Sequence, residues 1–165
     1  MILQPGSILI SAPSMDDPQF EKVVLLLTGT DENGSVGFVM NQLFERKFNE
    51  LVEFRHSRDL PLYSGGPVEK ESLYFIHRYP NLVNDGIPLK DGYYFGGDFK
   101  QAVRLINNKT INEPAVRLFV GYSGWDKGQL ETEIAEGSWI VANAPLTLLF
   151  SLPVTEAWDR LLQDY

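Results

Sequence analysis

Apolar residues occur along this chain in short runs bounded by glycine, proline, asparagine and aspartate. Such runs are typical of β-strands, and a continuously apolar run is typical of a strand buried on both faces. Asn33 and Gly34 suit a tight hairpin turn, because both residues accept positive φ angles. The run from Val23 to Leu27 is expected in the middle of a sheet. The pattern predicts strands at residues 7–12, 23–28, 35–41, 62–63, 72–79, 93–95, 115–121 and 138–142.

Two of the predicted strands alternate between faces. In residues 72–79, the alternation places His77 on a face with apolar neighbours, where we expect a buried histidine with satisfied ring nitrogens. In residues 115–121, valine and leucine alternate with Arg117 and Phe119. Each of these strands is therefore expected to place alternate residues on opposite faces of the sheet.

Helical spacing of apolar residues is found in other segments. Apolar side chains recur at i, i+4, i+7 and i+8 from Phe44, which predicts a helix at residues 44–54. Further helices are predicted after Asp98 and at residues 129–136 and 155–162. Because strands outnumber helices and include a hairpin, the pattern predicts an α+β fold, in a single domain that spans residues 1–165.

The composition narrows the classes of function. The chain has 165 residues, two histidines and no cysteine, which excludes disulfide scaffolds, thiolate metal sites and cysteine nucleophiles. Its formal net charge is −8, whereas DNA-binding proteins normally present a basic surface, so we do not expect direct DNA binding. The start of the chain has no signal-peptide pattern, and no apolar run is long enough to span a membrane. We expect a cytoplasmic protein with no membrane segment, no metal site and no cofactor, whose partner is an unidentified small molecule or protein.

Three segments carry specific motifs: residues 33–41 (NGSVGFVMN), 63–68 (YSGGPV) and 121–134 (GYSGWDKGQLETEI). In this order and spacing they resemble the YqgE/AlgH family of bacterial proteins, and the resemblance covers residues 6–158. It implies an α+β fold with a mixed, branched β-sheet and a small barrel-like core surrounded by helices. It implies no established biochemical activity, although members are often labelled transcriptional regulators.

The third motif follows a predicted strand and precedes a predicted helix, so residues 121–128 are expected to form a glycine-rich connecting loop. In this loop Trp125 either fills a core pocket or forms the floor of a ligand groove, and we expect it to be mostly buried. If the loop at residues 65–67 meets the loop at residues 121–128, the two would line a shared groove. The candidate binding residues are Asn41, Gly65, Gly66, Tyr122, Trp125 and Gln129.

Catalytic chemistry has weaker support in the sequence. Ser123 lies in a segment similar to a nucleophile elbow, but that motif needs a glycine where Trp125 stands. The candidate bases are His56 and His77. Backbone N–H groups of the third motif could hold an anion, although the motif lacks the ending of a phosphate loop. No catalytic residue and no metal ligand is therefore assigned.

These observations favour a cytosolic regulatory or binding protein whose effect on transcription is indirect. The alternative is a small-molecule enzyme, similar to a hydrolase, that uses the groove between the loops at residues 65–67 and 121–128. An enzyme needs a titratable group with a shifted pKa beside a nucleophile or a metal, whereas a binding protein needs apolar walls and a few polar anchors.

Overall fold

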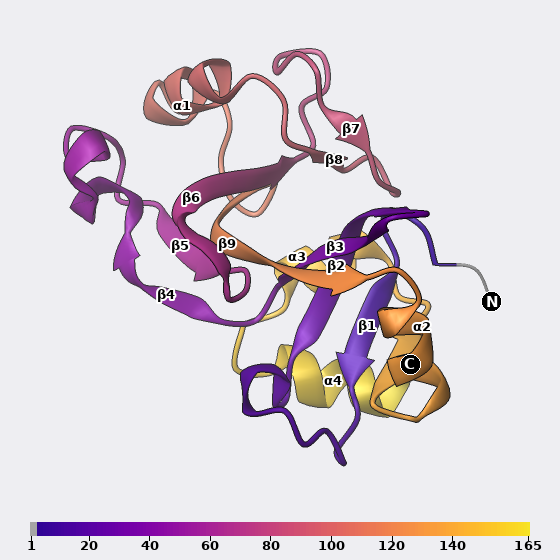
Figure 1. Ribbon diagram of the computed structural model, residues 1–165. Helices are drawn as coiled ribbons and strands as arrows, with labels where there is room; N and C mark the ends of the chain where they lie inside the picture. Colours follow the sequence, from indigo (N-terminus) through magenta and orange to yellow (C-terminus); the bar gives the residue numbers. More distant parts are fainter. Residues whose placement is uncertain (1–2) are drawn as a thin grey trace.

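A branched β-sheet organises the computed structural model, which describes residues 3–165 (Figure 1). Within these residues ten strands follow the order β10-β1-β2-β3-β9-β6-β8-β7, with β5 attached to β9 and β4 attached to β5. The strands are β1 (Ile8–Ser11), β2 (Val24–Asp31), β3 (Gly34–Val39), β4 (Leu43–Lys47), β5 (Pro61–Ser64), β6 (Val68–His77), β7 (Ile87–Pro88), β8 (Tyr94–Phe95), β9 (Val116–Asp126) and β10 (Trp139–Ala142).

Strand β9 is the branch point, because it pairs with β3, β5 and β6. The β5–β9 pair is parallel and the other pairs are antiparallel, so the sheet is mixed. The predicted α+β fold with a mixed, branched sheet is confirmed. The expected barrel-like closure is not observed, since β10 and β7 form two separate ends of the sheet in residues 3–165.

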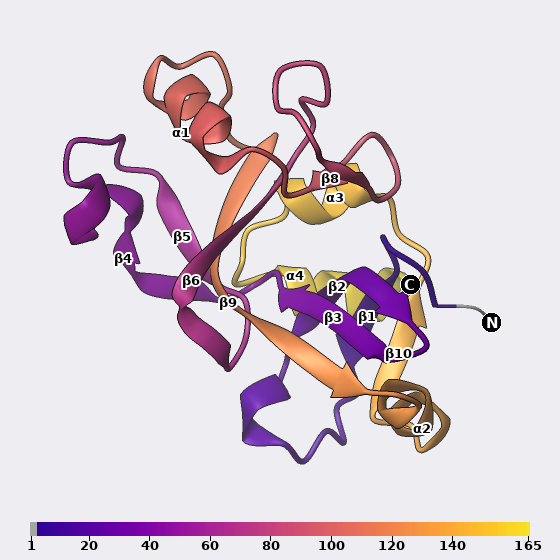
Figure 2. The same cartoon turned by 45° about the horizontal axis from the view of Figure 1, so that its top comes forward.

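The helices cover different parts of this sheet. They are α1 (Phe99–Asn107), α2 (Gln129–Ala135), α3 (Leu146–Ser151) and α4 (Ala157–Asp164), with short 3-10 helices η1 (Pro18–Phe20), η2 (Phe48–Glu50) and η3 (Val52–Phe54). Figures 1 and 2 both show α4 behind strands β1–β3 and α1 near the opposite end of the molecule. The Trp158 indole N–H donates to the Ser11 carbonyl (2.8 Å), which fixes α4 to β1. The Asp98 side chain caps α1, as expected, by accepting from the Gln101 N–H (3.1 Å).

The predicted alternation in the central strands is confirmed. On β9, Leu118 and Val120 join an apolar cluster that also contains residues of α1, whereas Phe119 joins a second cluster beneath α3 and α4. On β6, Phe75 belongs to the first cluster and Ile76 to the second. Strands β6 and β9 thus separate two cores, which is why both of their faces are apolar.

Two sequence predictions about local structure are wrong. The loop expected at residues 121–128 is mostly strand, because β9 continues to Asp126 and its last residues pair with β3. Gly121 has a φ angle of +72°, and at this point β6 bulges, so that Val68 pairs with Tyr122 while Leu73 pairs with Val120. The glycine therefore bends a continuous strand instead of ending it.

The helix expected at residues 44–54 is also not formed. This segment is strand β4, which pairs with β5, followed by η2 and η3. Phe48 is completely buried, and its N–H donates to the Leu60 carbonyl (2.8 Å) instead of to a residue one helical turn back. Tertiary pairing has overridden a short helical pattern, and the segment projects beside β6 as one wall of a groove.

Candidate functional site

The glycine motifs meet in space at a crossing of backbones. A Cβ atom on Gly65 would lie 2.4 Å from the Gly121 oxygen, and one on Gly66 would lie 2.3 Å from the Tyr122 oxygen. The Ser123 hydroxyl donates to the Gly65 carbonyl (3.1 Å), which also accepts from the Val39 N–H (2.9 Å). The two predicted loops do come together, but as packed backbones where only glycine fits.

The side chain of Asn41, two residues after β3, is hydrogen-bonded to the start of β2. Its Oδ1 accepts from the Val24 N–H (2.9 Å), and its Nδ2 donates to the Lys22 carbonyl (3.0 Å). Both bonds satisfy backbone groups at the start of β2. In this structure the side chain of Asn41 therefore bridges two chain segments.

Glu133 on α2 organises the aromatic part of the third motif. Its Oε1 accepts from the indole N–H groups of Trp125 (3.2 Å) and Trp139 (3.0 Å), and its Oε2 accepts from Gln129 Nε2 (3.2 Å). Trp125 is 5% exposed and stacks on Phe20 (5.8 Å between centroids), which confirms that it is mostly buried. The motif singles out Trp125 and Gln129, whereas Glu133 is one of several acids in this segment, a pattern that predicts solvated carboxylates. Its three hydrogen bonds correct that interpretation.

Tyr122 is half-buried and faces a shallow hollow. The hollow has a volume of about 470 Å³, and Val36, Val68 and Gly124 line it with Tyr122 and Trp125. The structure thus brings Tyr122 and Trp125 to one surface, and Gly66 packs against the Tyr122 backbone without lining the hollow. Asn41 and Gln129 do not line this hollow. The assignment of these residues to a ligand site stays a prediction.

The candidate serine chemistry has an unfavourable geometry. Ser123 is fully buried and its hydroxyl is engaged with Gly65, as described above. His77 is also fully buried: its Nδ1 accepts from the Tyr79 N–H (3.0 Å), so the ring proton is on Nε2 and points to the Gly96 carbonyl (3.0 Å). Burial lowers the pKa of His77, and the bond to Gly96 partly opposes this shift. A satisfied, buried His77 is therefore confirmed.

Arg117 is a buried cation with a structural role. Its Nη1 donates to the Met40 carbonyl (3.0 Å) and its Nη2 donates to the Phe150 carbonyl (3.2 Å). The guanidinium also lies over the ring of Tyr63, 4.2 Å from the centroid. Burial lowers the pKa of Arg117, and the charges of Tyr63 and Glu113 oppose that shift. Arg117 of β9 thus connects the end of α3 to the residue after β3 by donating to two backbone carbonyls. Among the described residues, no carboxylate accepts a hydrogen bond from it.

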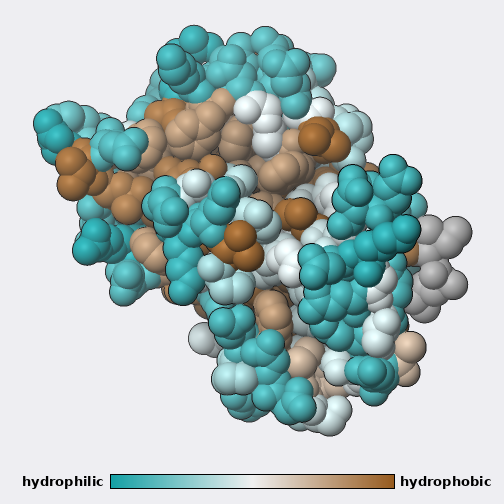
Figure 3. Space-filling view, viewed as in Figure 1, coloured by the Kyte–Doolittle hydropathy of each residue, from teal (hydrophilic) through white to brown (hydrophobic). Residues whose placement is uncertain are grey.

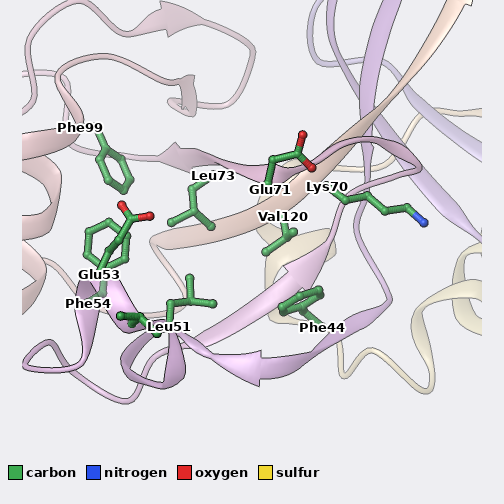
Figure 4. Close-up of a pocket in the computed structure, with 10 residues that line it drawn as sticks. Phe44, Leu51, Glu53, Phe54, Lys70, Glu71, Leu73, Phe99 and Val120 are labelled. Carbon is green, nitrogen blue, oxygen red and sulfur yellow. The ribbon is translucent and has the colours of Figure 1, made fainter.

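An open apolar groove lies away from these motifs, between the β4–η3 segment and β6 (Figure 4). It has a volume of about 400 Å³. The space-filling view shows apolar surface gathered over this part of the molecule (Figure 3). Exposed Val52 (77%) lies at its rim, and Val120 of β9 lies at its floor. The other apolar side chains that line it are Phe44, Leu51, Phe54, Leu73 and Phe99.

The charged residues of the groove lie on its edges. Glu53, Lys70 and Glu71 are exposed, and Figure 4 shows Glu53 near Phe54 and Lys70 at the opposite end. Within residues 3–165, no group of three histidine, aspartate or glutamate side chains could hold a metal ion. The groove therefore combines apolar walls with a few polar groups at its rim, which suits ligand binding.

The groove could not be predicted from the sequence, because the spacing of the apolar residues from Phe44 onward predicts one face of a helix. The one hint in the sequence is that Leu51 and Val52 are adjacent apolar residues followed by Glu53, so the predicted helix has no clearly polar face. That signal is weak, since exposed apolar residues are common on protein surfaces.

Comparison with known proteins assigns the chain to a family. A family model described as AlgH-like matches residues 8–165. The chain belongs to the AlgH-like family. This AlgH-like protein is 37% identical to a UPF0301 protein of Chlorobium limicola over 162 residues, which are 98% of this chain and 87% of that protein. It is 35% identical to a UPF0301 protein of Cytophaga hutchinsonii over 164 residues, 99% of this chain and 90% of the relative.

Two solved structures share the fold of this AlgH-like protein. The solution structure of AlgH from Pseudomonas aeruginosa matches with a TM-score of 0.75 and 25% identity, over 94% of this chain and 85% of that one. The crystal structure of protein DIP2367 from Corynebacterium diphtheriae matches with a TM-score of 0.79 and 20% identity, over 100% of this chain and 88% of that one. The family resemblance predicted from the three motifs is thus confirmed. None of the helices in residues 3–165 has the length and apolar character needed to cross a bilayer.

Proposed function

We propose that this AlgH-like protein is a cytosolic regulatory protein that binds a small apolar ligand in the groove between the β4–η3 segment and β6. The observation that carries the proposal is the apolar lining of an open hollow of about 400 Å³. Small-molecule sites in proteins typically measure about 300–1,000 Å³ and have mostly apolar walls. The groove has the size and lining of such a site.

Binding is favoured over hydrolysis by the location of the candidate catalytic groups. The Ser123 hydroxyl is buried and bonded to Gly65, and both ring nitrogens of His77 have backbone partners. A nucleophile must reach its substrate and lie within hydrogen-bond distance of a base. The groove walls instead present phenylalanine, leucine and valine.

The overall charge supports an indirect effect on transcription. At a net charge of −8 the protein is repelled by a polyanion at long range. A regulatory effect would then follow from the ligand state of the groove, passed on to another macromolecule. Direct, salt-sensitive binding to duplex DNA in a low-salt shift assay would contradict this part of the proposal.

The proposal is tested with the neutral dye N-phenyl-1-naphthylamine, whose fluorescence rises in apolar surroundings. Leu73→Gln introduces a polar group into the groove, and Leu82→Gln is the control, because Leu82 is 44% exposed and does not line the groove. We expect Leu73→Gln to weaken dye binding by about fivefold or more, since about 1 kcal/mol of apolar contact corresponds to that factor.

The control should bind the dye as the wild type does. Thermal melting of both variants checks that they are folded. Failure of the wild type to bind the dye, or equal affinity of the folded Leu73→Gln variant, would refute the groove as an apolar site.

A further inference from the structure

The apolar groove adjoins a second, polar hollow, and Lys70 lines both. The polar hollow has a volume of about 230 Å³ and lies between η1 and the start of β6. Gln19, Gln42 and Ser64 contribute polar side chains to its lining. Among the described residues that line it, Lys70 is the one charged side chain. The polar hollow is thus suited to a polar group of negative charge.

The bulge of β6 sets the position of Lys70. Residues 69–72 have no partner on β9, because Val68 pairs with Tyr122 and Leu73 pairs with Val120. Glu69 has a φ angle of +48°, and its Oε2 accepts from the Tyr74 hydroxyl (2.9 Å). These contacts hold the chain beside Lys70 while leaving its ammonium exposed.

The groove has one lysine and two glutamates at its edges. Figure 4 shows Lys70 at the end that contains Phe44, with its ammonium directed away from the apolar walls. Glu53 lies at the other end, and the carboxylate of Glu71 points in a different direction from the Lys70 ammonium. An anion is therefore attracted on the side toward which the Lys70 ammonium points, whereas Glu53 and Glu71 repel an anion that lies within the groove itself.

We infer that the groove and the polar hollow together form one site for an anionic amphiphile. The apolar tail lies against the groove walls, toward Phe54 and Phe99, and a carboxylate or phosphate head is held at Lys70. A lysine suits this position because its methylene stem can lie on an apolar surface while its ammonium remains in polar surroundings. This inference rests on the proposed function, since it names the ligand class of the same groove.

The test compares amphiphiles with similar alkyl tails and heads of opposite charge. Dodecanoate and dodecyltrimethylammonium, both below their micelle-forming concentrations, are used to displace the neutral dye from the wild type. We expect dodecanoate to bind about tenfold more tightly, the factor typical of a charge-assisted hydrogen bond. Lys70→Gln should remove this preference and Lys70→Glu should reverse it. Lys127→Gln, which alters an exposed lysine outside both hollows, should keep it.

Two further ligands, dodecyl phosphate and inorganic phosphate, test which anionic head is preferred and how much the alkyl tail contributes to binding. Calorimetry with dodecyl phosphate shows whether a phosphate or a carboxylate is preferred, and a preference for either that depends on Lys70 supports the inference. Inorganic phosphate alone should bind at least about tenfold more weakly than dodecyl phosphate, because it lacks the tail.

Equal affinity of dodecanoate and dodecyltrimethylammonium would overturn the inference while leaving the apolar groove intact. An unchanged head preference in Lys70→Gln would overturn it as well, as would inorganic phosphate that binds as tightly as dodecyl phosphate. Failure of the dye to bind the wild type is a different result, which refutes the proposed function itself.

Discussion

The backbone crossing and the open groove differ in how their residues are constrained. At the crossing, Gly65 and Gly121 lie so close together that a single added carbon atom would collide with backbone. In the groove, Leu51, Phe54 and Phe99 are partly exposed apolar residues that other apolar side chains could replace. The most specific motifs in this sequence therefore maintain the fold, whereas the surface suited to ligands is built from ordinary apolar positions.

Removal of the Trp125 ring should give the largest effect. Trp125→Ala deletes a side chain that is 5% exposed and stacked on Phe20, and its loss leaves Glu133 without one of its two indole donors. We expect the free energy of unfolding to fall by about 3–5 kcal/mol, the cost of removing a packed aromatic residue. Chemical denaturation measures this change, and an unchanged midpoint would show that the ring does not stabilise the fold.

A methyl group at the crossing should also destabilise the protein. In Gly65→Ala the new Cβ would lie 2.4 Å from the Gly121 oxygen and 2.7 Å from Phe38 Cδ2, so the backbones must separate. The expected loss is about 2–3 kcal/mol, in the upper range for overpacking. Gly29→Ala is the matched control, since a Cβ there would meet no atom within 4 Å. Equal melting temperatures for the two variants would contradict the proposed constraint.

A fall in pH should lower the free energy of unfolding through His77. This residue stacks on Phe75, which belongs to the apolar cluster that also contains residues of α1. Because burial lowers the pKa of His77 below 6.5, the unfolded chain takes up the proton first as the pH falls. The stability contributed by neutral His77 is complete above about pH 6.5 and declines below it, by at most about 1.4 kcal/mol per pH unit.

The measurement is the free energy of unfolding at several pH values between 7 and 5, for the wild type and for His77→Gln. Burial raises the pKa of Glu113, which shifts stability in the opposite direction but equally in both proteins. The wild type should therefore lose more stability than the variant over this interval. Parallel pH profiles would refute a role for His77.

The smallest effect on stability is expected at the rim of the groove. Val52 is 77% exposed, so Val52→Ser should change the free energy of unfolding by less than about 0.5 kcal/mol. Dye affinity should nevertheless fall, because the variant loses apolar surface at the groove. A melting temperature that drops as far as that of Gly65→Ala would show that the rim is part of the structural core.

Much of the fold could be predicted because periodicity and turn chemistry are local. The hairpin at residues 31–34, the alternation around Phe119 and the cap at Asp98 depend on neighbouring residues alone, although the turn lies at Glu32 and Asn33, one residue before the predicted Asn-Gly pair. The segment from Phe44 to Phe54 could not be predicted in this way, since its conformation depends on pairing with β5. Helix α3 was missed because it is short and its apolar residues resemble a strand.

The candidate site was harder to predict for a different reason. The motifs predict that Gly65, Gly66 and Tyr122 belong to one site, and these residues do lie close together. Sequence alone does not say whether such glycines admit a ligand or a second backbone, because both require the absence of a side chain. The groove carries no motif at all, and its apolar residues look like any others in the chain.

The order of the strands also affects how this chain folds while it is being synthesised. Strand β1 lies between β2 and β10, so one edge of the N-terminal hairpin stays open until residues 139–142 leave the ribosome. Unpaired strand edges promote aggregation, and pairings between distant residues form slowly. Nascent chains released before Trp139 should therefore aggregate, whereas chains that include α4 should not, and a truncation series assayed by pelleting would show the difference. We therefore expect the pairing of β10 with β1 to be a late step in the folding of this chain.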